Sequence, residues 1–248
     1  MKKIWIVMIM VLAAGLVFAA EPDFIKILEE ADFMGNFDAG DFSSLMTIVS
    51  VDPDEGTSVL KVNQFRRDAQ DKFLMLMQAP EDQKGQGYLR VDDNMWIYDP
   101  VSRKFNHFSM KESFEGTDAR YSDLGRSTLA DDYAVSGYTE GKLGRYEVYV
   151  VELEAKHDEV SFPYQKIWLR KDNNLILKVE SYSLTKRLLR TALFPSYTQV
   201  GEKFIASKML FTDELVEGKK TQITVSDISI DTLPDTVFTK SYVERVNR

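Results

Sequence analysis

The stretch KFLMLMQ at residues 72–78 has the composition of a β-strand but lacks the alternation of a strand with one wet face. Side chains of a strand alternate between the two faces of the sheet, so Phe73, Met75 and Met77 share one face and Leu74 and Leu76 share the other. Both faces are therefore apolar, which predicts apolar cover on both sides. A helix outside and a barrel interior inside would supply that cover.

Two further segments, residues 145–153 and 188–194, are apolar on both faces in the same way. A barrel with this many strands can be too wide for side chains to fill, so it can hold a ligand. A sandwich with a fully packed core explains the same pattern and stays open as the alternative.

The rest of the chain predicts one continuous antiparallel β domain. Pro22–Met34 has helical spacing of its apolar residues, and Lys111–Asp132 predicts a loop with short helical turns. No internal repeat or linker divides the chain. Alternating segments between turn residues predict strands near 44–51, 58–67, 72–78, 88–91, 95–98, 104–109, 135–139, 145–154, 165–170, 176–183, 188–194, 203–211 and 220–230.

Residues 1–19 have the layout of a secretory signal peptide. Lys2 and Lys3 precede an uncharged apolar run, and Val17 and Ala19 stand where a signal peptidase reads. We expect cleavage after Ala19, leaving a soluble domain of residues 20–248 in a periplasm; an uncleaved membrane anchor is the alternative. Because the chain has no Cys, it cannot itself be a diacylated lipoprotein.

Composition excludes several classes of function. Zero Cys rules out thiol catalysis, zinc–thiolate sites, iron–sulfur clusters and disulfides. A formal charge of -8 argues against nucleic-acid binding, and two His make a multi-histidine metal centre improbable. No catalytic motif occurs, so we expect no enzyme activity, no catalytic residues, no metal and no cofactor. Lys186, Arg187 and Arg190 form a small basic patch, interpreted as a solvated strand end, with a docking surface for anionic headgroups as the alternative.

Short blocks spread over the chain resemble the outer-membrane lipoprotein-sorting family, the LolA/LolB-like carriers. Each block is weak alone, and their order and spacing carry the resemblance. They are AP (79–80), KGQGYL (84–89), NMWIYDP (94–100), RK (103–104), SFEGTD (113–118), SDL (122–124), DY (132–133), YQKIWL (164–169), VFT (237–239) and Tyr242.

This resemblance implies a mainly β fold: a strongly curved, unclosed antiparallel β-barrel with a few helices as a lid over an apolar cavity. It implies a monomeric periplasmic carrier that takes lipoproteins, by their acyl chains, from an inner-membrane ABC-type exporter to an outer-membrane acceptor. Without a lipobox Cys the chain looks like the carrier and not the acceptor. A phospholipid or glycolipid carrier, an accessory lipid-binding subunit of an efflux system, and a structural envelope protein with a filled core are the alternatives.

The candidates for lining or gating the cavity are aromatic, Met and Leu side chains. They lie in the strands predicted between residues 58 and 109 and in the loop predicted for Lys111–Asp132. Ordinary core packing is the alternative for each of them. Arg66 and Arg67 lie near the place where related carriers use an Arg to hydrogen-bond the lid, although the flanking residues match poorly. The candidates for lipid binding are Phe65, Phe73, Met75, Met77, Trp96, Tyr98, Phe105, Phe114 and Leu124.

Overall fold

The predicted strands form one antiparallel sheet. The computed structural model describes residues 21–92 and 94–246, and the signal peptide predicted for residues 1–19 lies outside them. Within the described residues, thirteen strands follow the order β6-β5-β4-β3-β2-β1-β13-β12-β11-β10-β9-β8-β7. Their bounds are β1 (Phe42–Asp52), β2 (Gly56–Arg67), β3 (Lys72–Ala79), β4 (Gly87–Val91), β5 (Asn94–Asp99), β6 (Lys104–His107), β7 (Tyr133–Leu143), β8 (Tyr146–Ala155), β9 (Tyr164–Arg170), β10 (Ile176–Tyr182), β11 (Leu188–Val200), β12 (Lys203–Asp213) and β13 (Lys220–Ser229).

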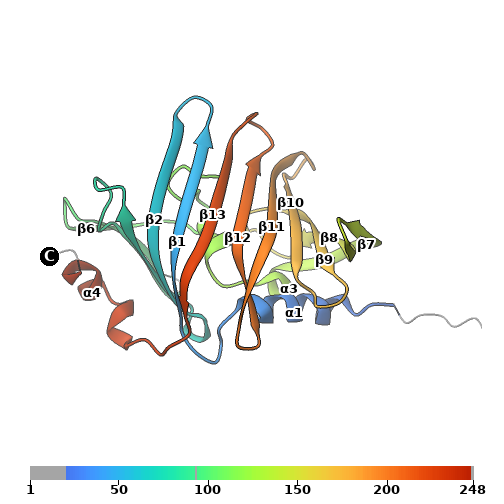
Figure 1. Ribbon diagram of the computed structural model, residues 1–248, viewed down its shortest axis with the longest axis horizontal. Helices are drawn as coiled ribbons and strands as arrows, with labels where there is room; N and C mark the ends of the chain where they lie inside the picture. Colours follow the sequence, from blue (N-terminus) through green and yellow to red (C-terminus); the bar gives the residue numbers. More distant parts are fainter. Residues whose placement is uncertain (1–20, 93, 247–248) are drawn as a thin grey trace, which may run out of the picture.

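The sheet has two arms that meet in its middle. Neighbouring strands follow one another in the chain except where β1 pairs with β13, with Met46 opposite Val225 and Ile48 opposite Ile223. Strands β6 and β7 are left at the two edges, and the sheet curves strongly between them (Figure 1). The expected curved and unclosed antiparallel barrel is therefore confirmed for the part of the chain that the structure describes.

Short helices accompany the sheet, and α1 and α3 lie together at one end of it (Figure 1). The helix predicted over Pro22–Met34 is confirmed with slightly shifted ends, and the Asp23 carboxylate caps it by accepting from the Lys26 amide at 3.2 Å. The loop with helical turns predicted for Lys111–Asp132 is confirmed too. The helical segments are α1 (Phe24–Gly35), η1 (Asp68–Gln70), α2 (Tyr121–Leu124), α3 (Leu129–Asp132), η2 (Asp235–Phe238) and α4 (Lys240–Arg245).

Strand β3 is covered on both faces, as the pattern of residues 72–78 predicts. On the concave face Phe73, Met75 and Met77 belong to the main core. On the convex face Leu74 and Leu76 belong to a second apolar cluster that η2 and α4 complete. The two-sided apolar strand thus separates the interior of the curved sheet from an outer cover.

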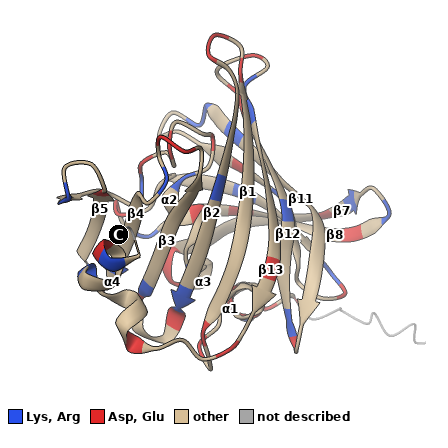
Figure 2. Cartoon of the chain, turned by 60° about the vertical axis from the view of Figure 1, so that its left-hand side comes forward, with Lys and Arg blue, Asp and Glu red and all other residues tan. Residues whose placement is uncertain are grey.

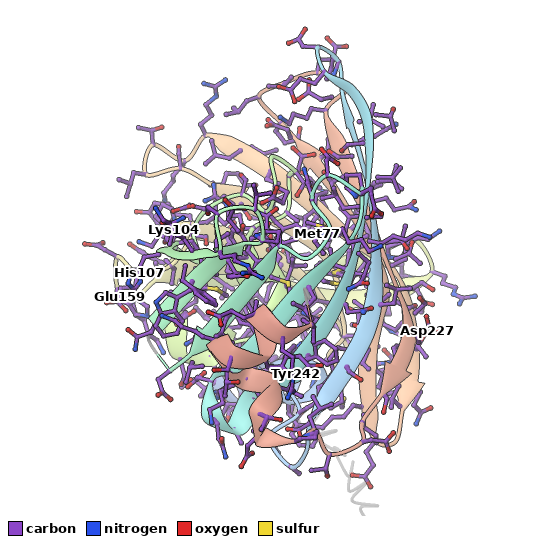
Figure 3. All side chains as sticks on the ribbon, turned by 90° about the vertical axis from the view of Figure 1, so that its left-hand side faces the viewer. Met77, Lys104, His107, Glu159, Asp227 and Tyr242 are labelled. Carbon is purple, nitrogen blue, oxygen red and sulfur yellow. The ribbon has the colours of Figure 1, made fainter. Side chains whose placement is uncertain are left out.

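The sequence predicted a helix as the outer cover but not which segment supplies it, because η2 and α4 are each too short to show a helical period. Figure 3 looks onto α4, which lies across the outside of the sheet and carries Tyr242. The backbone of Gly87 passes so close that a Cβ there would lie 2.6 Å from Val243 Cγ1. The Lys240 ammonium lies 4.0 Å from the ring centroid of Trp96. A glycine and a cation–π contact thus allow α4 to pack closely.

Candidate functional site

A cavity of about 780 Å³ lies on the concave side of the sheet. Strands β1 and β9–β13 wall it, and α1 with the segment that follows it closes one side. We call this region, α1 with β1 and β9–β13, the hollow half of the concave side. Its wall is mostly apolar and includes Phe42, Met46, Val179, Ala192, Phe194, Ile205, Ala206, Met209, Phe211 and Val225.

Strand register explains why these side chains gather on one wall. Val179 stands opposite Ala192, and Ala192 stands opposite Phe211, so one row crosses β10, β11 and β12. Directly opposed residues of antiparallel strands share a face. Met46 and Val225 are opposed in the same way on β1 and β13. These rows place short, branched and flexible apolar side chains around a space that they do not fill.

Helix α1 covers the hollow half and is fastened by hydrogen bonds to residues 127–130. The Asp32 carboxylate accepts from the Leu129 and Ala130 amides at 3.0 and 2.9 Å and from the Ser127 hydroxyl. Asn36 donates to the Ser127 carbonyl at 2.7 Å and accepts from its amide at 2.8 Å. Burial raises the pKa of Asp32, although these donors act in the opposite direction. Polar contacts rather than an apolar seal hold this edge of the cover.

Of the two arginines proposed as lid contacts, Arg66 reaches the helix. Its Nη2 donates to the Gly35 carbonyl at the end of α1 at 3.3 Å, while its Nε donates to Asp68 at 2.9 Å. Asp68 also accepts from the Phe37 amide at 2.8 Å, so Arg66 and Asp68 together hold the chain where it leaves α1. A role for Arg66 in opening this cover stays a prediction.

Arg67 instead holds the C-terminal segment. It donates to Asp41 at 2.8 and 2.9 Å and to the Leu233 carbonyl at 2.6 Å, and it pairs with Asp235. The guanidinium keeps the pKa of Asp41 below its ordinary value. Arg67 therefore ties β2 to the start of β1 and to η2, away from α1.

The other half of the concave side is filled. A connection of residues 108–121 runs inward from β6 and packs its aromatic side chains against β3 and β4. Tyr88 lies 5.2 Å from Phe114, 5.3 Å from Tyr121 and 6.1 Å from Phe108, measured between ring centroids. Tyr88 and Phe114 are fully buried, and burial raises the pKa of Tyr88. We call β3, β4 and residues 108–121 the filled half.

The predicted lining residues are spread over three environments. Leu124 lines the cavity. Phe73, Met75, Met77 and Phe114 are in the main core but lie in the filled half.

The remaining candidates, Phe65, Trp96, Tyr98 and Phe105, belong to the second cluster on the convex face. On β2 the alternating buried residues Leu60, Val62, Gln64 and Arg66 share one face, and Phe65 lies on the other face together with Arg67. Contact of any candidate with an acyl chain stays a prediction, and the cavity wall consists mainly of residues that the sequence did not single out.

Arg190 is a buried charge in the cavity wall, which corrects its interpretation as part of a solvated patch. Charged residues lie mostly at strand ends and turns (Figure 2), and Lys186 and Arg187 in the β10–β11 turn are exposed. Arg190 is only 6% exposed. Its Nη2 donates to Asp123 at 2.9 Å, and its guanidinium carbon lies 4.8 Å from the ring centroid of Phe162. Proximity in sequence to Lys186 and Arg187 concealed this role.

The acidic and histidine side chains of residues 21–92 and 94–246 do not gather into a metal site. No group of three or more His, Cys, Asp or Glu stands close enough there to hold a metal ion. His157 pairs with Asp132 at 3.2 Å on the surface. No helix in the same ranges has the length and apolar character needed to cross a membrane.

Comparison with known proteins identifies the fold of this chain. A protein-family model described as "Uncharacterized protein" matches residues 69–245. A solved structure assigned as an outer membrane lipoprotein-sorting protein domain, from Vibrio parahaemolyticus, is 25% identical, with a TM-score of 0.78 over 89% of this chain and 98% of that chain. A LolA superfamily protein from Nitrosomonas europaea is 22% identical, with a TM-score of 0.76 over 88% of this chain and 97% of that chain.

A DUF1329 family protein from Desulfovibrio piger gives the same values: 22% identity and a TM-score of 0.76, over 88% of this chain and 97% of that chain. No curated protein matches the sequence. The family match covers most of the chain, and the structural likenesses show that its fold is that of the LolA superfamily.

Proposed function

This chain belongs to the family whose model matches residues 69–245 and has the LolA-superfamily fold, and on that premise we propose that it is a periplasmic carrier of acyl chains. The chains bind in the hollow half, without covalent chemistry. The observation that carries the proposal is the apolar cavity of about 780 Å³ under α1. Cavities of this size and character are typical of small-molecule and lipid sites.

The energetics suit a carrier. Burying acyl carbon contributes ~0.8 kcal/mol per CH₂, so a chain of about fourteen carbons gains roughly 10 kcal/mol before the costs of association. Delivery to another protein then requires a cover that opens. Helix α1 is held at this edge by the contacts of Asp32, Asn36 and Arg66, each of which can break and reform. We infer that movement of α1 admits and releases the chain.

The finer role is transfer of lipoproteins from an inner-membrane ABC-type exporter to an outer-membrane acceptor. Free phospholipid or glycolipid cargo, or service to an efflux system, would use the same cavity. Extraction of the protein, purified from its own envelope, with organic solvent and mass spectrometry separates these roles. Acylated peptides support lipoprotein transfer, and free phospholipid or glycolipid redirects the proposal to those cargoes.

Binding itself is tested by filling the cavity. Ala206 lines the cavity, so Ala206→Phe places a ring in the space that the chain would occupy. We expect this variant to keep a cooperative melt and to lose at least tenfold in affinity for a fluorescent fatty-acyl probe. Ala119→Phe is the matched control, because Ala119 is fully buried in the filled half and does not line the cavity.

The Ala119→Phe control should lose ~1–3 kcal/mol of stability by overpacking. The folded fraction of this variant should bind the probe with the affinity of the wild-type protein. A wild-type protein that binds no acyl probe, or an Ala206→Phe variant that binds it unchanged, would contradict the proposal.

A further inference from the structure

A polar row crosses the wall of the hollow half. Gln165 on β9 stands opposite Ser181 on β10, and Ser181 stands opposite Arg190 on β11. Directly opposed residues share a face and adjacent strands are ~5 Å apart, so the three side chains form a line across the concave face. Gln165 and Arg190 line the cavity. The apolar pair Val179 and Ala192 is next to this line on the same strands.

Each member of the row has a buried polar atom that no other described group of the protein satisfies. These atoms are Gln165 Oε1, Ser181 Oγ and Arg190 Nε. Ser181 is 1% exposed and Arg190 is 6% exposed. A buried donor or acceptor without a partner costs about 1–3 kcal/mol, so folded proteins rarely keep one without a use. Three in adjacent positions beside an apolar cavity indicate a hydrogen-bonding site.

The donor at one end of the row is held rigidly. The guanidinium of Arg190 lies between the rings of Phe162 and Phe211, at 4.8 and 4.9 Å from their centroids. Its two terminal nitrogens bind Asp123, and Nη1 also donates to the Asp118 carbonyl at 3.0 Å. These contacts leave Nε as the guanidinium nitrogen that has no hydrogen-bond partner among the described residues. An oriented donor beside an apolar wall suits one fixed polar group on a long apolar ligand.

The charge of the row selects the ligand's polar group. Asp123 already balances the positive charge of Arg190 through two hydrogen bonds. A carboxylate bound at Arg190 Nε would lie next to the carboxylate of Asp123 in a buried place, and the repulsion between the two like charges is costly. A neutral carbonyl accepts from Arg190 Nε and from the Ser181 hydroxyl without that cost. The amide of Gln165 can face either a donor or an acceptor on the ligand.

We propose that Gln165, Ser181 and Arg190 form a subsite for the carbonyl of a neutral acyl linkage, an ester or an amide, whose apolar chain occupies the hollow half. The inference deepens the proposed carrier function and rests on it. The carrier thereby distinguishes chains that are still linked to glycerol or to an amine from free fatty acids.

The test compares three ligands with the same chain: dodecanoic acid, its glycerol monoester and N-dodecanoylglycinamide. Each displaces Nile red from the purified protein at pH 8, where the acid is ionised. We expect the monoester and the amide to bind at least tenfold more tightly than the acid. A higher affinity of the amide than of the monoester would identify an amide-linked cargo, and the reverse order an ester-linked cargo.

Variants connect this preference to the row. Ser181→Ala and Gln165→Leu should each weaken monoester binding by ~5–10-fold, the usual worth of a hydrogen bond, and leave acid binding within about twofold. Ser196→Ala, at an exposed position of β11, should change nothing. Because Ser181 Oγ has no protein partner among the described residues, Ser181→Ala should not lower the melting temperature of the free protein.

The outcomes separate the two proposals. If the acid binds as tightly as the monoester, or if Ser181→Ala leaves their ratio unchanged, the subsite is overturned while acyl-chain binding stands. If neither the dye nor any of the three ligands binds the wild-type protein, the carrier function fails and the subsite fails with it.

Discussion

The filled half and the hollow half are built from the same kind of strand, yet only one contains a cavity. Met75 in the filled half and Met46 in the hollow half are both within 1% of complete burial. Around Met75 the space is taken by the rings of residues 108–121, whereas Met46 borders the cavity. The difference therefore arises from the connection between the edge strands β6 and β7 and not from the strands.

That connection gives each half a different task. In the filled half the inserted aromatic residues supply a packed core that supports the curved sheet. In the hollow half the chain returns as α2 and α3, and residues 127–130 hold α1 over the remaining space. A single inserted loop thus supplies both the core on one side and the fastening of the cover on the other.

The largest expected difference between the halves follows a charge placed in each. Met75→Glu buries an unpaired carboxylate among close-packed rings, and we expect a loss of ~4 kcal/mol or more, enough to unfold most of the protein. Met209→Glu faces the cavity, where water can reach the carboxylate, so we expect a folded protein that has lost acyl binding. Urea unfolding measures both. Equal destabilisation would mean that the halves do not differ in packing.

The covers of the two faces should differ in strength. Arg67→Met leaves the buried carboxylate of Asp41 unpaired, and we expect a loss of roughly 3–5 kcal/mol. Asn36→Ala removes two hydrogen bonds that hold α1, at about 1–3 kcal/mol. Asn36→Ala should also speed the release of a bound acyl probe, measured by stopped flow. If a folded Arg67→Met variant released the probe faster and Asn36→Ala did not, the moving cover would be the C-terminal segment and not α1.

Truncated aromatic residues give a smaller contrast. Phe114→Leu removes ring contacts in the fully buried centre of the filled half, and we expect a loss of about 1–2 kcal/mol. Phe194→Leu changes a partly exposed cavity wall, so the expected loss is below about 0.5 kcal/mol. Denaturant midpoints at constant slope measure the difference. A larger cost at Phe194 would place the packed core on the other side.

The smallest expected effect is on the pH dependence of the free energy of unfolding. Asp41, near the outer cover, and Asp32, on α1, should change it in opposite directions. The pKa of Asp41 is lowered by Arg67, so its stabilisation is present above the unfolded value, about 4, and is lost as the pH falls below it. The pKa of Asp32 is raised by burial, so its stabilisation is complete below about 4 and declines as the pH rises through the folded value.

Unfolding free energies from pH 3 to 7 test these signs. Asp41→Asn should flatten the acid side of the wild-type curve, and Asp32→Asn should flatten the decline above it. Identical curves for both variants would remove the distinction between the two carboxylates.

The strands could be predicted because alternation and turn residues are local properties of the sequence. The two-sided apolar pattern at residues 72–78 also predicted the outer cover before the segment that supplies it was identified. The cavity wall could not be predicted, because its place depends on where residues 108–121 fold across more distant strands. The environment of Phe65 could not be predicted, because an aromatic residue that packs against the outer cluster has the same local pattern as one that faces the interior. Arg190 was missed because its partner Asp123 is 67 residues away in sequence.

Mapping the bound chain tests the central claim most directly. A fatty-acyl monoester with a diazirine near the chain end is bound to the protein and photolysed, and the labelled peptides are identified by mass spectrometry. We expect labels in the hollow half, on residues 31–46 and 188–211, and none on residues 72–89 or 112–121, which do not line the cavity. Labels concentrated on the filled half, or no label above that of an unfolded control, would contradict it.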